Sequence, residues 1–297
     1  MRNKQQKLAI VISSILVALV GIIVKLVGDT LHPFTFTFYR LFIGTIFLFI
    51  VLPLIDQDFY KVRLKDFKLF AISGFFLAAS ISSFVYAVNL IDVSSAVLIT
   101  STYVFFVVLF AFLFLKEKLR HRQVISMILI LAGLMILNPL NLAGSFKGVL
   151  IAILNAIFHA ALLVYMKFAG KNHRSSSIAW SLLFASILLA PSLLIFGTGE
   201  IISVIPHMMF VGGVLTAIPY TLLAFGLKDI STDTTAIIQL SITPVSAIIF
   251  AAVFLGEKLT EQTIMGGSLI VVGGITLIYS ISKFKNFLSA HLHAHHQ

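Results

Sequence analysis

The sequence predicts an all-α membrane protein with ten transmembrane helices, arranged as two inverted five-helix repeats. Three observations lead to this prediction: the composition, an internal repeat, and an uneven distribution of basic residues. Hydrophobic residues make up 59% of the 297-residue chain and charged residues 11%, whereas an ordinary soluble domain has about 25% charged residues. A soluble chain this apolar could not cover its surface with polar groups. The bilayer must therefore be the solvent for most of it.

The internal repeat has a period of 140 residues and needs no gap. The segment AVLITSTYVFFVVLFAFLFLKEKL at 96–119 recurs as AIIQLSITPVSAIIFAAVFLGEKL at 236–259. Each copy is an apolar run of about 20 residues, the length that spans a bilayer, and it ends in charged residues. The chain thus divides into a first repeat at 1–140, a second repeat at 141–285 and a His-rich tail at 286–297. Identical pairs at this offset include Ala96/Ala236, Ser101/Ser241, Phe110/Phe250, Glu117/Glu257 and Gly133/Gly273.

Ten apolar segments follow one another along the chain. All are expected to be helices, because a backbone in lipid must form its hydrogen bonds internally, and the runs lack the alternation of barrel strands. The first follows basic residues as a signal peptide would, but it is too long, and we predict a retained helix. The segments are roughly 8–28, 34–54, 67–89, 93–115, 122–138, 147–167, 177–196, 206–227, 232–255 and 262–281.

The basic residues indicate the orientation. With the N-terminus inside the cell, 17 of the 21 Lys and Arg residues fall on the inner side, while Lys25, Lys147 and Lys258 fall on the outer side. This imbalance predicts cytoplasmic N and C termini and an integral, multi-pass protein of the cytoplasmic membrane. Five helices per repeat is an odd number, so the second repeat must enter the membrane inverted. Inverted repeats are typical of secondary transporters, whose substrate sites lie near the midplane between the halves.

Polar side chains within the spans are the candidate substrate-binding residues, because burying a polar group in lipid is costly. His159 lies in the middle of the sixth segment, with Asn155 one turn earlier on the same face. This pair could bind substrate or accept a proton, or His159 could be a neutral histidine bonded to a neighbouring helix. Serine and threonine often only bond their own backbone, and tyrosines can anchor at interfaces. The other candidates are Tyr86, Ser101, Tyr103, Tyr220, Gln239 and Thr243.

Four further residues are predicted to have structural roles. Arg40 would hold helix contacts, with attraction of an anionic group as the alternative. Glu117 and Glu257 follow the fourth and ninth segments, where the helix dipole disfavours an anion. We expect them to clamp the next helix N-terminus or a nearby basic residue. Pro244 would free a backbone carbonyl that a ligand could use.

Several function classes are disfavoured. The chain has no HExxH, GxSxG or Walker motif, so we predict no enzyme. No Asp or Glu lies deep in a span, and Cys is absent, so we predict no cofactor and no metal site. The four histidines of the tail could hold a metal weakly, but a tail without fixed structure is favoured. The net charge of +10 reflects topology signals, so no nucleic acid is expected. Lipid and a small-molecule substrate are the predicted partners, with a homodimer left open.

The segments FLFLKEKL, TPVSAIIFAAVFLGEKLT and HPFTFTFYRLFIGTIFL resemble the fourth, ninth and second helices of the drug/metabolite transporter superfamily, in its EamA-type ten-helix branch. The likeness extends over nearly the whole chain. It implies a secondary carrier that exports a metabolite, amino acid or drug. A channel or pore is the alternative, followed by an intramembrane enzyme. Val104 stands where Pro244 stands in the second repeat, which leaves open whether the fourth helix is kinked.

Overall fold

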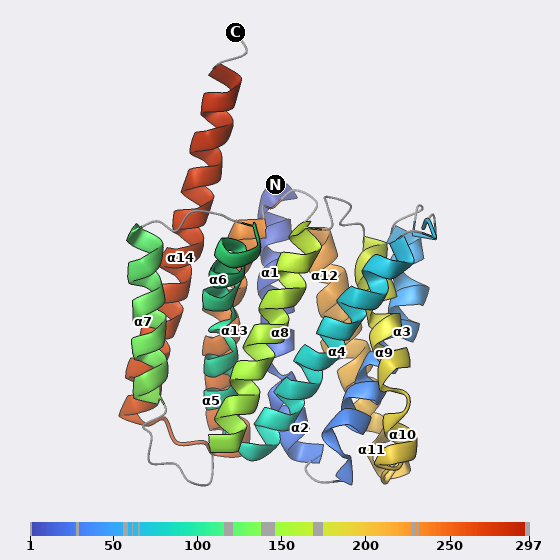
Figure 1. The fold of residues 1–297 in the computed structure, drawn as a ribbon. Helices are drawn as coiled ribbons and strands as arrows, with labels where there is room; N and C mark the ends of the chain where they lie inside the picture. The colour runs from blue at the N-terminus through green and yellow to red at the C-terminus, as the bar shows by residue number, and fades with distance from the viewer. Residues whose placement is uncertain are drawn as a thin grey trace.

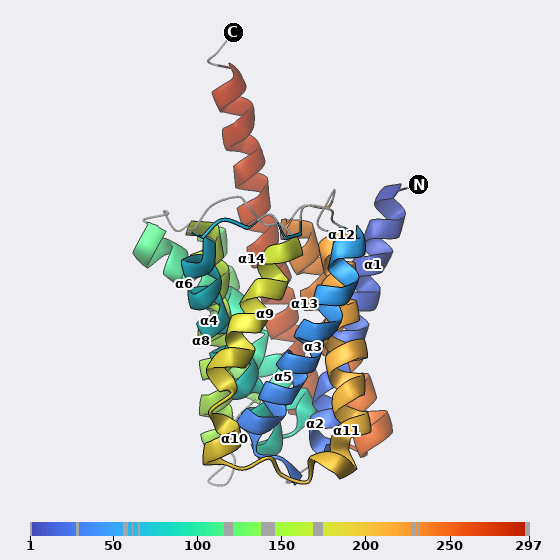
Figure 2. The same cartoon turned by 90° about the vertical axis from the view of Figure 1, so that its right-hand side faces the viewer.

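The computed structural model describes residues 2–27, 30–55, 59–60, 62–64, 66–115, 121–137, 146–168, 175–226, 230 and 232–294. Within these residues the protein is a bundle of upright helices without strands (Figure 1). Helix α1 begins and helix α14 ends on the same side of the bundle, as both views show (Figures 1 and 2). We call this side the terminal side and the other the opposite side.

The helices follow the predicted order. Among the described residues, eight helical stretches are long and apolar enough to cross a membrane, and two shorter apolar stretches, Gln123–Ile136 and Glu261–Leu277, lie in α7 and α14. The predicted all-helical membrane fold is confirmed, although two of its ten segments are matched only by these shorter stretches. The helices are α1 (Arg2–Ala18), α2 (Val20–Val27), α3 (Pro33–Ile55), α4 (Asp66–Leu90), α5 (Val93–Thr100), α6 (Tyr103–Leu115), α7 (His121–Leu137), α8 (Phe146–Phe168), α9 (Ser175–Leu189), α10 (Ser192–Ile195), α11 (Ile201–Met209), η2 (Phe210–Ala217), α12 (Ile218–Gly226), α13 (Thr232–Leu255) and α14 (Glu261–Ala294).

The two halves are related by a twofold exchange, which is clearest where α7 packs against α14. A Cβ added at Gly133 of α7 would lie 2.6 Å from the carbonyl oxygen of Gly266 and 3.0 Å from the Ile270 nitrogen. A Cβ added at Gly273 of α14 would lie 3.0 Å from the Ser126 carbonyl oxygen and 3.2 Å from the Ile130 nitrogen. Adding or subtracting 140 turns the residues of one contact into the residues of the other. The same contact is therefore made once by each repeat toward its partner repeat.

The inversion of the repeats is visible in the ribbon. Helix α1 starts on the terminal side, whereas its repeat equivalent α8 starts on the opposite side (Figure 1). The buried apolar side chains form a core that includes both halves, for example Leu41 and Leu98 of the first and Leu215 of the second. This arrangement places the boundary between the halves in the interior of the bundle, where solute sites of inverted-repeat proteins are found.

The fourth span is interrupted although it lacks a proline. Helix α5 ends at Thr100 and α6 begins at Tyr103. The hydroxyls of Thr100, Ser101 and Thr102 donate to the carbonyl oxygens of Val97, Val97 and Ile99, at 2.9, 2.8 and 2.6 Å. Three successive hydroxyls that bond back to their own helix compete with its backbone ladder, which accounts for the break. Pro244, in contrast, lies within the continuous helix α13.

The eighth span contains a π-helix. It runs as α11, η2 and α12, and η2 is an eight-residue π-helical segment. The Thr216 hydroxyl donates to the carbonyl oxygen of Val211, five residues earlier, at 2.8 Å. A Cβ added at Gly212 would lie 2.6 Å from Ile43 side-chain atoms, so η2 and α3 approach closely at this glycine. Wide π turns within membrane helices occur frequently at functional sites.

The C-terminal end differs from the prediction. In its described part, 286–294, the tail continues α14 as a helix that projects beyond the bundle on the terminal side (Figure 1). The expectation of a tail without fixed structure is therefore wrong for these residues. The helix can extend because 278–294 lacks Gly and Pro, the residues least compatible with a helix interior.

Candidate substrate site

The structure brings two of the predicted site residues into contact. His159 of α8 meets Tyr103 of α6 edge to face, with ring centroids 4.7 Å apart and an interplanar angle of 79°. Tyr103 begins α6 directly after the break in the fourth span, and His159 lies near the middle of α8. Tyr103 belongs to the first repeat and His159 to the second. The pair therefore lies on the boundary between the two halves.

Asn155 shares a helix face with His159, but its amide is already engaged. The side chain is 7% exposed, and its Nδ2 donates to the Ser80 carbonyl oxygen at 2.6 Å and to the Ser80 hydroxyl at 3.1 Å. Ser80 lies on α4, so this interaction joins α4 to α8. The geometry favours a role for Asn155 in holding the helices that carry His159.

Three further candidates lie in the fourth and ninth spans: Ser101 at the break in the fourth span, and Gln239 and Thr243 just before Pro244 in the ninth. Gln239 and Thr243 lie one turn apart on α13 and are half-buried. The Thr243 hydroxyl donates to the Ser14 carbonyl oxygen of α1 at 3.5 Å, whereas Gln239 forms no hydrogen bond within the described part of the chain. The hydroxyl of Ser101 bonds its own helix. Pro244, the residue that follows Thr243, is buried.

Arg40 and Tyr220 form a second polar cluster at the same boundary. The Arg40 side chain is 6% exposed, and its Nε–H donates to the Thr216 hydroxyl of η2 at 3.0 Å. Tyr220 lies four residues after Thr216, one turn further on in α12. Arg40 belongs to the first repeat, and Thr216 and Tyr220 to the second.

Tyr86 lies away from His159, at the opposite side of the bundle. Its ring meets His32 edge to face at 6.2 Å, and the Lys147 ammonium lies 5.7 Å from its centroid. Lys147 and His159 are twelve residues apart on α8, about 18 Å along the axis. His32 stacks on Phe196 with centroids 3.7 Å apart. We call His32, Phe34, Tyr86 and Phe196 the opposite-side aromatic cluster, a feature that the sequence analysis did not identify.

Glu257 binds the N-terminus of a helix in the other repeat. Its carboxylate accepts the backbone N–H groups of Val93 and Ser94 at 2.7 and 3.1 Å, and the Ser94 hydroxyl at 2.6 Å. These residues open α5, where the positive end of the helix dipole favours an anion. The capped helix is thus not the next one in the chain. Glu117, the equivalent residue of the first repeat, lies outside the described residues.

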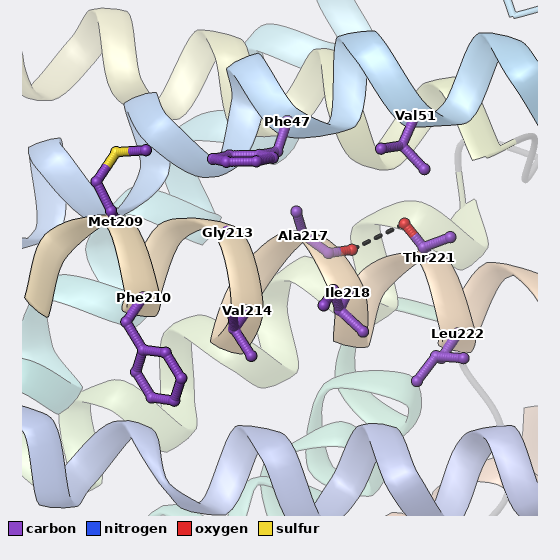
Figure 3. A pocket seen from close by; sticks show the side chains of 10 residues that line it. All are labelled: Phe47, Val51, Met209, Phe210, Gly213, Val214, Ala217, Ile218, Thr221 and Leu222. Atoms are coloured by element: carbon purple, nitrogen blue, oxygen red, sulfur yellow. Dashed lines mark hydrogen bonds between the residues drawn. The ribbon is translucent and has the colours of Figure 1, made fainter. Parts of the chain in front are cut away.

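A groove of about 600 Å³ lies elsewhere and is almost wholly apolar. It is lined by residues of α3, α11, η2 and α12, and the one hydrogen bond drawn in it joins the Thr221 hydroxyl to the Ala217 carbonyl oxygen at 2.8 Å (Figure 3). Phe210 and Ile218 at its edge are 41% and 44% exposed, as side chains facing lipid are. A groove of this character suits acyl chains rather than a polar solute.

The buried polar groups repeatedly join one repeat to the other. Besides the pairs above, the Ser13 hydroxyl donates to the Pro219 carbonyl oxygen at 2.9 Å. Sequence reasoning did not identify Ser13, Ser80 or Ser94 as partners, because small hydroxyl residues are frequent in membrane helices for many reasons. Among the described residues no group of three His, Asp or Glu side chains has the arrangement of a metal site.

Inverted repeats, a helical bundle with membrane-length apolar spans, and a polar boundary between the halves define a membrane transporter of the inverted-repeat class. The chain belongs to the EamA-like transporter family, whose sequence profile matches residues 7–138 and again residues 146–280. The two matches correspond to the two repeats. The resemblance stated from the sequence is thereby confirmed.

Curated relatives cover most of the chain. An uncharacterized transporter from Archaeoglobus fulgidus is 30% identical over 89% of this chain and 93% of its own length. The pseudopaline exporter CntI of Pseudomonas aeruginosa is 26% identical over 92% and 96%. The S-adenosylmethionine uptake transporter of Rickettsia bellii is 25% identical over 87% and 88%. A solved structure, described as "Crystal structure of protein", shares the fold with a TM-score of 0.64 at 20% identity, covering 90% of this chain and 94% of the other.

Proposed function

We propose that this protein is a secondary carrier that exports a small organic solute, such as a metabolite, amino acid or drug, across the cytoplasmic membrane by alternating access. The observation that carries this proposal is the contact between Tyr103 and His159, which joins the two inverted repeats inside the bundle. A site made by both halves can face either side of the membrane as the halves move relative to each other.

The chemistry of this boundary supports recognition of a polar solute. The imidazole of His159 offers one donor and one acceptor when neutral, the Tyr103 hydroxyl offers both, and the amide of Gln239 adds two donors and an acceptor. The flat rings suit an aromatic or cationic part of a solute. Curated relatives named as an exporter and as an uptake transporter support carriage of organic solutes in the family, and the direction proposed here is export.

The basic residues support the proposed orientation. Lys4, Lys7 and Lys68 lie at helix ends on the terminal side, whereas Lys147 and Lys258 lie at the opposite side. Positive charges collect on the cytoplasmic side of membrane proteins. We therefore place both termini in the cytoplasm and the opposite-side aromatic cluster outside.

Transport by purified protein in liposomes tests the proposal. Vesicles are loaded with a panel of amino acids, organic acids and cationic drugs, and the release of each compound is measured by mass spectrometry. We expect saturable release of one class, and acceleration by the same solute on the far side, which a carrier shows and a pore does not. Release that equals that of empty vesicles for the whole panel contradicts a carrier, and unsaturated flux without such exchange favours a channel.

Variants of His159 connect the transport to the site. His159→Ala should weaken transport strongly, while His207→Ala, a change at an exposed histidine of α11, should leave it unchanged. His159→Gln keeps a polar group but cannot titrate. If His159 carries a coupled proton, the dependence of transport on pH across roughly 5 to 8 should become flat in this variant. A wild-type pH response in folded His159→Gln would exclude that role.

A further inference from the structure

Arg40 is a buried cation for which the described part of the chain provides no carboxylate partner. It lies seven residues after the first residue of α3, about 10 Å along the helix, and is 6% exposed. The ion pair found among the described residues joins Arg63 to Asp66 at a surface turn. All 11 acidic residues of the sequence lie between the apolar segments or at their ends, whereas Arg40 lies within an apolar segment.

The surroundings of Arg40 hold it in place without neutralising it. Thr216 accepts the Nε–H, and its own hydroxyl hydrogen is committed to the Val211 carbonyl oxygen within the π-helix. The Thr216 oxygen is thereby oriented toward the guanidinium. A guanidinium has five N–H donors in a planar fork, and this interaction uses one of them. Tyr220 adds a hydroxyl group on the next turn of the same span.

A purely structural role does not explain the positive charge. A neutral amide such as glutamine could donate one hydrogen bond to Thr216, and it would avoid the cost of a charge in a membrane span, about 2.5–3.5 kcal/mol on insertion scales. Buried charges are retained where they are paired, because an unpaired one is strongly unfavourable. The charge at this position therefore indicates an anionic partner that the described part of the chain does not supply.

We propose that Arg40, positioned by Thr216 and assisted by Tyr220, binds a carboxylate of the transported solute. The inference rests on the proposed carrier function and narrows its substrate to organic acids or zwitterions that carry a carboxylate. One guanidinium matches the single charge and the two oxygens of one carboxylate, whereas a phosphate group brings up to two negative charges. Tyr103, His159 and Gln239 then contact the remainder of the solute.

Ligand-induced stabilisation of the purified, detergent-solubilised full chain tests this directly. The probes are the carboxylic acids of the transport panel, including benzoate, succinate and phenylalanine, each beside its neutral carboxamide, and inorganic phosphate. Wild-type protein should be stabilised by at least one carboxylate and not by its amide. Arg40→Gln should bind that carboxylate about 10- to 100-fold more weakly, as expected for the loss of hydrogen bonds to a charged group.

Matched variants keep the test decisive. Lys25→Gln also removes a cation from a membrane helix, and it should bind like wild type. Arg40→Lys retains the charge but loses the fork, so it should bind with intermediate affinity. It also replaces Arg40→Gln if that variant does not fold. Equal stabilisation by acids and amides, equal stabilisation by phosphate, or wild-type affinity in Arg40→Gln would each overturn the assignment.

The transport assay separates this inference from the proposed function. If liposomes with wild-type protein transport a solute that Arg40→Gln also transports with unchanged affinity, the carrier function stands and the carboxylate site is wrong. If carboxylates bind through Arg40 but no solute of the panel is transported, the site stands and the carrier function is contradicted.

Discussion

Replacing Glu257 with glutamine should destabilise the protein without changing its affinity for solute. The Glu257 carboxylate accepts three hydrogen bonds at the start of α5, at 2.7, 3.1 and 2.6 Å. A carboxamide retains only one acceptor oxygen, and its NH₂ group cannot accept from the Val93 or Ser94 N–H. At least one backbone donor of α5 then loses its partner, and the remaining bonds lose their charge.

The expected loss can be estimated from these contacts. Hydrogen bonds to charged groups contribute about 1.5–3 kcal/mol each, against about 0.5–1.5 kcal/mol for neutral ones, and an anion at a helix N-terminus adds about 0.3–1 kcal/mol. Because Glu257 is only half-buried, we take the lower part of this range and expect Glu257→Gln to lose about 2 kcal/mol. Ser94→Ala removes the hydroxyl donor alone and should lose about 1 kcal/mol.

Reversible unfolding of the detergent-solubilised protein by dodecyl sulfate measures this free energy. Glu200→Gln is the matched control, because Glu200 precedes α11 as its N-cap residue but its side chain makes no capping hydrogen bond. A free energy of unfolding within about 0.5 kcal/mol of wild type, the range of ordinary surface substitutions, would refute the capping role of Glu257. Normal stability together with lost solute binding would instead assign Glu257 to the solute site.

Three further predictions concern other parts of the molecule. Burial lowers the pKa of His32, so the neutral imidazole is favoured in the folded protein. The stability that the neutral His32 contributes is present above its ordinary pKa, about 6.5, and is lost as the pH falls toward the lowered pKa of the folded protein. Thermal unfolding at pH 5 to 8 should show this loss in the wild type and not in His32→Gln. Asn155→Ala leaves Ser80 without its partner, and it should cost about 1–3 kcal/mol of unfolding free energy while Asn155→Ser costs less; equal losses would contradict this. In this Cys-free chain, Lys258→Cys should react with an impermeant thiol reagent from outside whole cells and Lys68→Cys should not, and the reverse pattern would invert the proposed orientation.

The sequence was sufficient to predict the spans, their order and the inverted repeat. These depend on apolar length, odd helix number and a gapless offset, which are all local or periodic properties. It was not sufficient to predict which polar groups meet. Asn155 and His159 share a helix face, yet Asn155 bonds Ser80 on α4 while His159 contacts Tyr103 on α6. Which neighbour each side chain meets depends on helix packing, which a single sequence does not encode in a readable pattern.

Local irregularities were the other limit of prediction. The sequence left the break in the fourth span open, because Val104 stands where the second repeat has Pro244. The break could have been predicted from the run Thr100–Ser101–Thr102, since three consecutive hydroxyls can bond back to the helix. The π-helix of the eighth span had no comparable signal, because the Thr216 bond to Val211 is recognised only once the backbone register is known. The partner of Glu257 is 163 residues away, and it was equally unpredictable.

The exchanged glycine contacts of α7 and α14 have a mechanical consequence. Gly133 meets Ile270 as Gly273 meets Ile130, so the axis that relates the halves passes between these two helices. Points on a rotation axis stay where they are when the two sides trade conformations. A cycle that exchanges the shapes of the two halves would therefore turn the Gly133 contact into the Gly273 contact and the reverse, so the seam between α7 and α14 would end the exchange with the geometry with which it began.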